Sequence, residues 1–200
     1  MPTLQHFPIA QQAAVNSCWA CVARCIINWY NGLGEANGQS YASDQALATA
    51  WQTATGQNQN GNINIQQSAA GALISLGFLA EIDDHAIPTP AEIGDSINNN
   101  HPLLAMLGTT EPDPDPNPDY QAGHWVVIVG IEEAAEDSDG DTNMDGNSDD
   151  DMDEEAFILS VFDPNDGQIH QVDYDAATYE NGVWWQNTSY VDPYAAPAAD

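Results

Sequence analysis

In the first half of the chain, apolar residues recur every three or four positions, which is the spacing expected of a helix with a buried side. Three segments share this spacing and are predicted to be helices: residues 17–30, 43–54 and 65–76. The first is apolar on nearly every side, so it should be buried, with Asn16 or Ser17 as its cap. Thr89 and Glu92 fit a capping box, which predicts a fourth, short helix that ends at residues 98–100.

The second half of the chain changes to short apolar runs, which favour strands. Five runs are predicted to be strands of an antiparallel sheet: residues 102–107, 124–131, 156–162, 169–174 and 184–191. The predicted fold class is therefore α+β, with an N-terminal helical half packed on a C-terminal antiparallel β-sheet.

Length and composition indicate one domain, because 200 residues with 42% hydrophobic residues can bury a sizeable core. We predict a single domain over residues 1–192, with an acidic hairpin insert at residues 132–155 and a disordered tail at residues 193–200. No apolar stretch approaches the roughly 18 residues of a membrane span, and no signal peptide is visible. We expect a soluble protein, cytoplasmic or exported by a route that the sequence does not reveal.

The charge balance is extreme, with 31 acidic residues against a single basic one, Arg24, and a formal net charge of −30. Thirteen of the acidic residues lie in the insert, which leaves 18 in the rest of the chain. The surface outside the insert is therefore strongly acidic as well. Such self-repulsion is largely screened at about 1 M salt, where the Debye length is about 3 Å. The composition therefore indicates a halophilic protein, or else an acidic protein tuned for solubility. We expect a monomer, with neither nucleic acid nor membranes as partners.

The three cysteines, Cys18, Cys21 and Cys25, fall within eight residues of one predicted helix. Their odd number argues against a disulfide framework, and no further ligand lies nearby to complete a metal site. A thiol attacks a carbonyl as the thiolate, which the N-terminus of a helix favours. Cys18 occupies the first turn and is the predicted nucleophile, whereas Cys21 and Cys25 are expected to be small core residues.

A nucleophilic thiol needs a base, and two of the five histidines, His101 and His124, directly precede apolar strands. The third member of a triad separates them. If the strands at 124–131 and 156–162 form a hairpin with Ile131 opposite Ala156, His124 faces Asp163 on one side of the sheet. Asp163 can then orient the imidazole ring.

The order of these residues resembles that of papain-like cysteine peptidases, and in particular their compact prokaryotic form. The resemblance spans about residues 11–191 and rests on the following motifs: Gln12, Cys18-Trp19-Ala20, Gly123-His124-Trp125 and Asp163-Pro164-Asn165-Asp166-Gly167. It implies a papain-like fold with a cleft between the two halves, and a thiol protease that hydrolyses peptides or proteins without a required cofactor. It also implies that Gln12 and the backbone N–H of Cys18 form the oxyanion hole, with Gln11 as the alternative.

Two features depart from papain itself. Papain uses asparagine to orient the histidine, whereas the motif here favours Asp163, with Asn165 as the alternative. The insert is longer than a hairpin needs, and Asp141, Asn143 and Asp145 match the first half of a calcium loop. The insert is therefore a candidate Ca²⁺ site or a solvated, disordered loop.

Two alternatives to a peptidase remain. Relatives of this fold that pass the acyl group to an amine would make the chain a transpeptidase or acyltransferase. A non-catalytic calcium-binding module on an inactive peptidase scaffold is the other, although the presence together of Gln12, Cys18, His124 and Asp163 argues against it.

Overall fold

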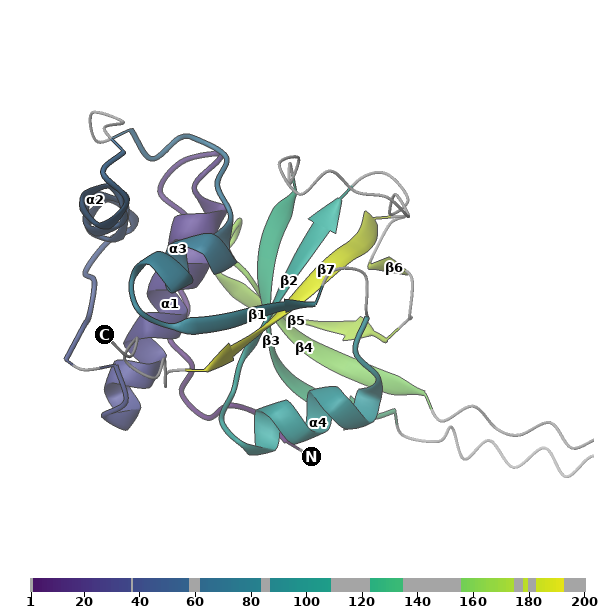
Figure 1. Cartoon of the computed structure of the whole chain (residues 1–200). Helices are drawn as coiled ribbons and strands as arrows, with labels where there is room; N and C mark the ends of the chain where they lie inside the picture. The colour runs from purple at the N-terminus through teal and green to yellow at the C-terminus, as the bar shows by residue number, and fades with distance from the viewer. Residues whose placement is uncertain are drawn as a thin grey trace, which may run out of the picture.

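The computed structural model describes residues 2–36, 38–57, 62–83, 87–108, 123–134, 156–174, 178–179 and 183–192. These residues form an α+β fold, in which α1, α2 and α3 lie together on one side of an antiparallel sheet and α4 lies at one end of it (Figure 1). The helices are α1 (Cys18–Leu33), α2 (Asp44–Thr55), α3 (Ala69–Ser75) and α4 (Pro90–Asn98). The strands are β1 (Leu79–Asp83), β2 (Leu103–Gly108), β3 (His124–Glu133), β4 (Phe157–Asp163), β5 (Gln168–Asp173), β6 (Thr178–Tyr179) and β7 (Val183–Asp192).

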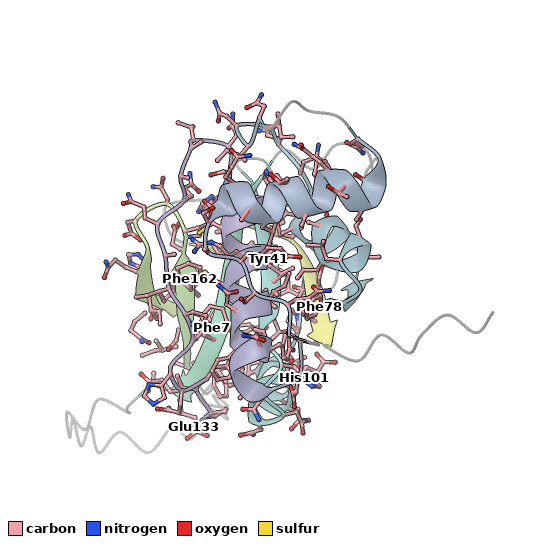
Figure 2. All side chains as sticks on the ribbon, turned by 90° about the vertical axis from the view of Figure 1, so that its left-hand side faces the viewer. Phe7, Tyr41, Phe78, His101, Glu133 and Phe162 are labelled. Carbon is pink, nitrogen blue, oxygen red and sulfur yellow. The ribbon has the colours of Figure 1, made fainter. Side chains whose placement is uncertain are left out.

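The central helix of the fold is α1, which contacts α2 and α3 on one side and β3 on the other. Its buried side chains include Trp19, Ile26 and Tyr30, none of which has exposed surface. Each large apolar side chain buried in this way contributes about 1.5–3 kcal/mol to folding. Phe7, which precedes α1, links the helix to the sheet, with its ring centroid 6.0 Å from that of Trp29 and 5.9 Å from that of Phe162 (Figure 2).

The helix ends follow local signals in most places. Thr89 and Glu92 form the predicted capping box, and α2 is capped by the hydroxyl of Ser43. The prediction that a helix begins at residue 65 is wrong, because α3 begins four residues later, after Ser68 caps the N–H of Gly71. The carbonyls of Ile65 and Gln67 accept hydrogen bonds from two tryptophan side chains instead.

The described strands pair in the order β1-β7-β2-β3-β4-β5, with β6 on β7, and every pair is antiparallel. All five predicted strands are present. The sequence pattern did not predict β1 and β6, which both pair with β7. As a result, the helical half of the sequence also contributes an edge strand to the sheet.

The β3–β4 hairpin is present, but its predicted register is wrong. Ile131 lies opposite Leu159 and not opposite Ala156, a shift of three residues. A β-bulge between Ile128 and Gly130 removes one residue of this shift, so that Val127 lies opposite Phe162. The net shift at the His124 end is therefore two residues, and a shift of two leaves every side chain on the same face.

The N-terminal segment explains where the bulge falls. Leu4 N donates to the carbonyl of Val129 at 2.8 Å, and Thr3 pairs with Gly130. A Cβ atom on Gly130 would lie 2.9 Å from Thr3 Oγ1, so the side chain of Thr3 would have to shift if Gly130 were replaced.

β3 extends into the first residues of the predicted insert. The strand continues through Glu132 and Glu133, and Ala134 N donates to the carbonyl of Ala156 at 2.8 Å. Residues 135–155 of the predicted insert lie outside the described residues. The predicted tail at 193–200 lies outside the described residues.

Candidate active site

Cys18 is the first residue of α1, at the end of the helix that carries a partial positive charge. Ser17 occupies the cap position, but its side chain does not cap the helix. Its hydroxyl instead donates to the carbonyl of Ala14 and accepts the N–H of the same residue, both at 2.9 Å. The partial positive charge of the helix end is therefore not shared with a side-chain cap.

Cys21 and Cys25 are enclosed in the core, with 0% and 1% of their surfaces exposed. The thiol of Cys21 donates to the carbonyl of Ala10 at 3.1 Å. A hydrogen bond with Cys25, together with burial, raises the pKa of Cys21 well above its usual value. Cys21 therefore stays a thiol at neutral pH, as expected of a core residue.

His124 begins β3, and its imidazole contacts two other predicted site residues. Nε2 lies 2.7 Å from Oδ1 of Asp163, and the side chain of Cys18 lies close enough to the ring to raise its pKa. Because Nε2 is bound to Asp163, Nδ1 is the ring nitrogen that is left for the thiol. The structure thus brings together three of the four predicted site residues in the order Cys18, His124, Asp163.

The surroundings of His124 favour the imidazolium form. Burial alone would lower the pKa of His124, but the hydrogen bonds and negative charges of Asp163 and Cys18 outweigh it and raise that pKa to about 9. For Asp163, burial acts in the opposite direction, and the hydrogen bonds from His124 and from the N–H of Asn165 hold its pKa below the usual range. At neutral pH the two groups therefore form an ion pair.

Asp163, and not Asn165, contacts the imidazole. Asn165 contributes its backbone: its N–H donates to Oδ1 of Asp163 at 2.7 Å, and its carbonyl accepts from the side chain of Gln11 at 3.1 Å. The carboxylate is thus fixed from a second direction, which restricts the imidazole bound to it.

Gly123 is required for this placement of His124. A Cβ atom on Gly123 would lie 2.6 Å from the carbonyl oxygen of Leu107 and 2.7 Å from Cγ of Met106. Any larger residue would push the start of β3 away from β2, and the imidazole would move with it.

Gln12 lies in the loop before α1, and its side-chain amide stays within that loop. Nε2 donates to the carbonyl of Val15 at 3.0 Å, which leaves the second N–H of the amide for another acceptor. Oε1 is buried and has no hydrogen-bond partner among the described residues. Gln11, the alternative, directs its amide away to Asn165 and is exposed.

Two tryptophans hold a further segment, residues 65–67, beside the site. The indole of Trp19 donates to the carbonyl of Ile65 at 2.9 Å, and the indole of Trp125 donates to that of Gln67 at 3.1 Å. Trp19 directly follows Cys18 and Trp125 directly follows His124 in the sequence. This adjacency is the sequence feature that could have indicated their place beside the site. Residues 65–67 are thereby held by the helix that carries Cys18 and by the strand that carries His124. The helix α3 begins after this segment.

None of the other described histidines hydrogen-bonds Cys18, His124 or Asp163, although His170 is near enough to help lower the pKa of Asp163. His101 follows α4, where its N–H and carbonyl bind Ser96, and His170 forms an exposed pair with Asp166 at 2.9 Å. His6 is exposed in the N-terminal segment. His85 lies outside the described residues.

The predicted calcium ligands Asp141, Asn143 and Asp145 also lie outside the described residues. Within the described part of the chain, no group of three or more His, Cys, Asp or Glu side chains is arranged to hold a metal ion. None of the helices described has the length and apolar character needed to cross a membrane. Neither models of known protein families nor curated protein sequences match the chain.

Proposed function

We propose that the protein is a papain-like cysteine peptidase in which Cys18 is the nucleophile, His124 the general acid and base, and Asp163 the residue that orients His124. One observation carries the proposal: the imidazole hydrogen-bonds Asp163 and lies close enough to Cys18 for that side chain to raise its pKa. A thiol at a helix N-terminus beside an oriented histidine matches the arrangement by which cysteine nucleophiles are activated.

In the acylation step, the Cys18 thiolate attacks the carbonyl carbon of a peptide bond. The backbone N–H of Cys18 and the free amide N–H of Gln12 donate to the oxyanion that develops. The protonated His124 then gives its proton to the leaving amine, the C–N bond breaks, and a thioester remains on Cys18. The pKa of about 9 supports this role, because His124 carries the proton at neutral pH.

In the deacylation step, the now neutral His124 accepts a proton from water, and the resulting hydroxide attacks the thioester. The acid product leaves, and the thiolate and the imidazolium are restored. Asp163 keeps Nε2 protonated throughout, so that Nδ1 is the nitrogen that exchanges protons. If an amine takes the place of water, the same site is an acyltransferase.

The proposal is tested by alkylation and by product analysis in about 2 M sodium chloride. An iodoacetamide-type probe should label Cys18 at neutral pH, and His124→Ala should slow labelling by about 100-fold. Cys21→Ala is the matched control and should label normally. A peptide library incubated with the protein should then yield free carboxylic acids, as mass spectrometry would show.

Three results would count against this function. Labelling of Cys18 that is independent of His124 would remove the pair from the mechanism. Amide products in place of free acids would assign the acyltransferase activity. A folded protein that neither labels nor cleaves would support the non-catalytic module.

A further inference from the structure

Residues 10–13, here called the Gln12 segment, run between the helices and the sheet and are held from both sides. On the sheet side, the N–H of Gln12 donates to the carbonyl of Pro164 at 2.7 Å, and Gln11 binds Asn165. Gly167 packs so closely that a Cβ atom there would lie 2.8 Å from the backbone nitrogen of Gln11. The Gln12 segment is thus fastened to the turn that follows Asp163.

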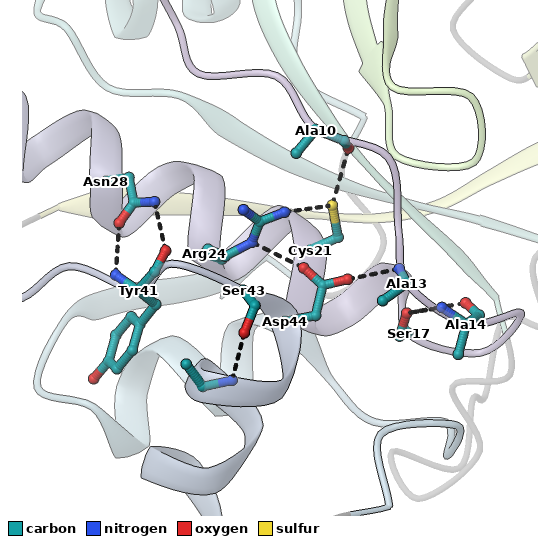
Figure 3. A network of polar contacts seen from close by, with 11 residues as sticks. Ala10, Ala13, Ala14, Ser17, Cys21, Arg24, Asn28, Tyr41, Ser43 and Asp44 are labelled. Atoms are coloured by element: carbon teal, nitrogen blue, oxygen red, sulfur yellow. Dashed lines mark hydrogen bonds and ion pairs between the residues drawn. The ribbon is translucent and has the colours of Figure 1, made fainter.

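On the helix side, the segment is held by a network centred on a buried ion pair (Figure 3). Asp44, at the start of α2, accepts the N–H of Ala13 at Oδ2 and the Nε–H of Arg24 at Oδ1, both at 2.8 Å. Arg24 also donates to Sγ of Cys21 at 3.8 Å, and Cys21 donates to the carbonyl of Ala10. Both ends of the Gln12 segment are therefore tied to the same pair of charges.

The composition of the chain makes this pair unusual. Arg24 is the only Lys or Arg among 200 residues, yet its partner Asp44 is 1% exposed and Arg24 itself only 13%. Salt screens exposed charge pairs strongly and buried pairs much less. The single base therefore serves a contact that persists at high ionic strength, and it does not neutralise the acidic surface.

The side chain of Gln12, which this arrangement holds in place, has an unsatisfied hydrogen-bond acceptor. The amide oxygen of Gln12 is buried without a partner among the described residues, which is unfavourable for folding. Backbone contacts on both sides of Gln12 keep it there. A costly placement that several contacts enforce is the pattern expected where a polar group is positioned for function.

We propose that Arg24 and Asp44 are positioning residues, which set the distance of the Gln12 amide from Cys18 by clamping the Gln12 segment to α1 and α2. The inference rests on the proposed function, because it assigns the pair to the oxyanion hole of that reaction. Arg24 and Asp44 touch no reacting atom, and they act only through Gln12.

The test compares Asp44→Asn with Tyr30→Phe. An asparagine can accept one of the two hydrogen bonds, but its NH₂ group then faces the other donor, so one end of the clamp is lost. Tyr30→Phe removes a different buried hydrogen bond of α1, the one to the carbonyl of Val191 at 2.6 Å. It controls for loss of stability at a site away from the Gln12 segment.

Two reactions separate positioning from general damage. Peptide hydrolysis needs the oxyanion hole, whereas alkylation by iodoacetamide displaces iodide and forms no oxyanion. Asp44→Asn should lower kcat by about 10- to 100-fold, with alkylation of Cys18 within about twofold of the unmodified protein. Tyr30→Phe should leave both rates within about twofold. Arg24→Gln, which removes the charge opposite Asp44, should lower kcat in the same way and is the variant to use if Asp44→Asn does not fold.

Hydrogen exchange of the peptide that covers residues 10–14 tests the clamp without relying on activity. Exchange should be at least about tenfold faster in Asp44→Asn than in the unmodified protein, and unchanged in Tyr30→Phe. Unchanged exchange in folded Asp44→Asn, or equal losses of kcat and alkylation, would overturn the inference. An unmodified protein that neither labels nor cleaves would instead overturn the proposed function, whatever the exchange shows.

Discussion

His124 and Asp163 are hydrogen-bonded across the β3–β4 ladder at 2.7 Å although they occupy diagonal positions in it. Val127 pairs with Phe162, so continuing the ladder by one residue sets Asp163 opposite Val126. His124 lies two residues further along on the same face, within reach of a long side chain. This diagonal depends on the bulge beside Gly130, because without it the shift would be three residues and the side chains would face opposite ways.

The first prediction concerns the nucleophile. Cys18→Ala should abolish hydrolysis without unfolding the protein, because this thiol alone stands at the start of α1. Cys25→Ala should retain activity and lose about 1–2 kcal/mol of unfolding free energy, since this residue fills the core. Initial rates and urea unfolding curves measure the two effects. Loss of activity in folded Cys25→Ala would contradict the assignment.

The second prediction concerns the residue that orients His124. Asp163→Asn can still accept both hydrogen bonds at its oxygen, but it removes the negative charge that holds the imidazolium. The pKa of His124 should then fall from about 9 toward its ordinary value, and turnover should fall by about tenfold or more. The pH–rate profile measures both, because its alkaline limb should move to lower pH.

Asn165→Ala is the matched control for that experiment, because this residue contributes only backbone groups to Asp163 and Gln11. It should leave the alkaline limb in place. Greater damage from Asn165→Ala than from Asp163→Asn would assign the orienting role to the asparagine side chain.

The third prediction follows from the pKa of His124, which folding raises from 6.5 to about 9. The folded state binds this proton more tightly than the unfolded state, so the contribution is fully present below about pH 6.5 and is lost as the pH rises through 9. Because about a third of the side chain is exposed, we expect about 1–2 kcal/mol.

The measurement is the free energy of unfolding at pH 6 and pH 9 in 2 M sodium chloride, for the unmodified protein and for His124→Asn. The difference between the two proteins should shrink at pH 9. A difference that stays constant would show that the pair does not form in the folded protein.

The fourth prediction concerns salt. A surface with a net charge of −30 repels itself in the folded protein, which destabilises the compact state at low salt. Screening weakens this repulsion as the salt concentration rises. The free energy of unfolding should therefore be larger at 2 M than at 0.1 M sodium chloride, as urea unfolding curves would measure. An unchanged free energy of unfolding would confine the role of the surface charge to solubility.

Features that depend on neighbouring residues along the chain could be predicted from the amino-acid sequence. The capping box at Thr89, the buried helix that begins at Cys18 and the five apolar strands all follow from side chains within a few residues of one another. The same local logic distinguished Cys18 from the two core cysteines, because only one of the three can occupy the first turn of the helix.

How distant segments meet could not be predicted in this way. The pairing of β1 with β7, the bulge near Gly130 and the contacts of Asp44 with Arg24 and Ala13 each join residues far apart in the sequence. A strand that slips by one residue keeps its apolar pattern but reverses its faces, so the pattern alone could not fix the β3–β4 register. The bulge in that register lies where the N-terminal segment contacts β3, with Leu4 on Val129 and Thr3 beside Gly130, and no periodicity within β3 or β4 encodes these contacts.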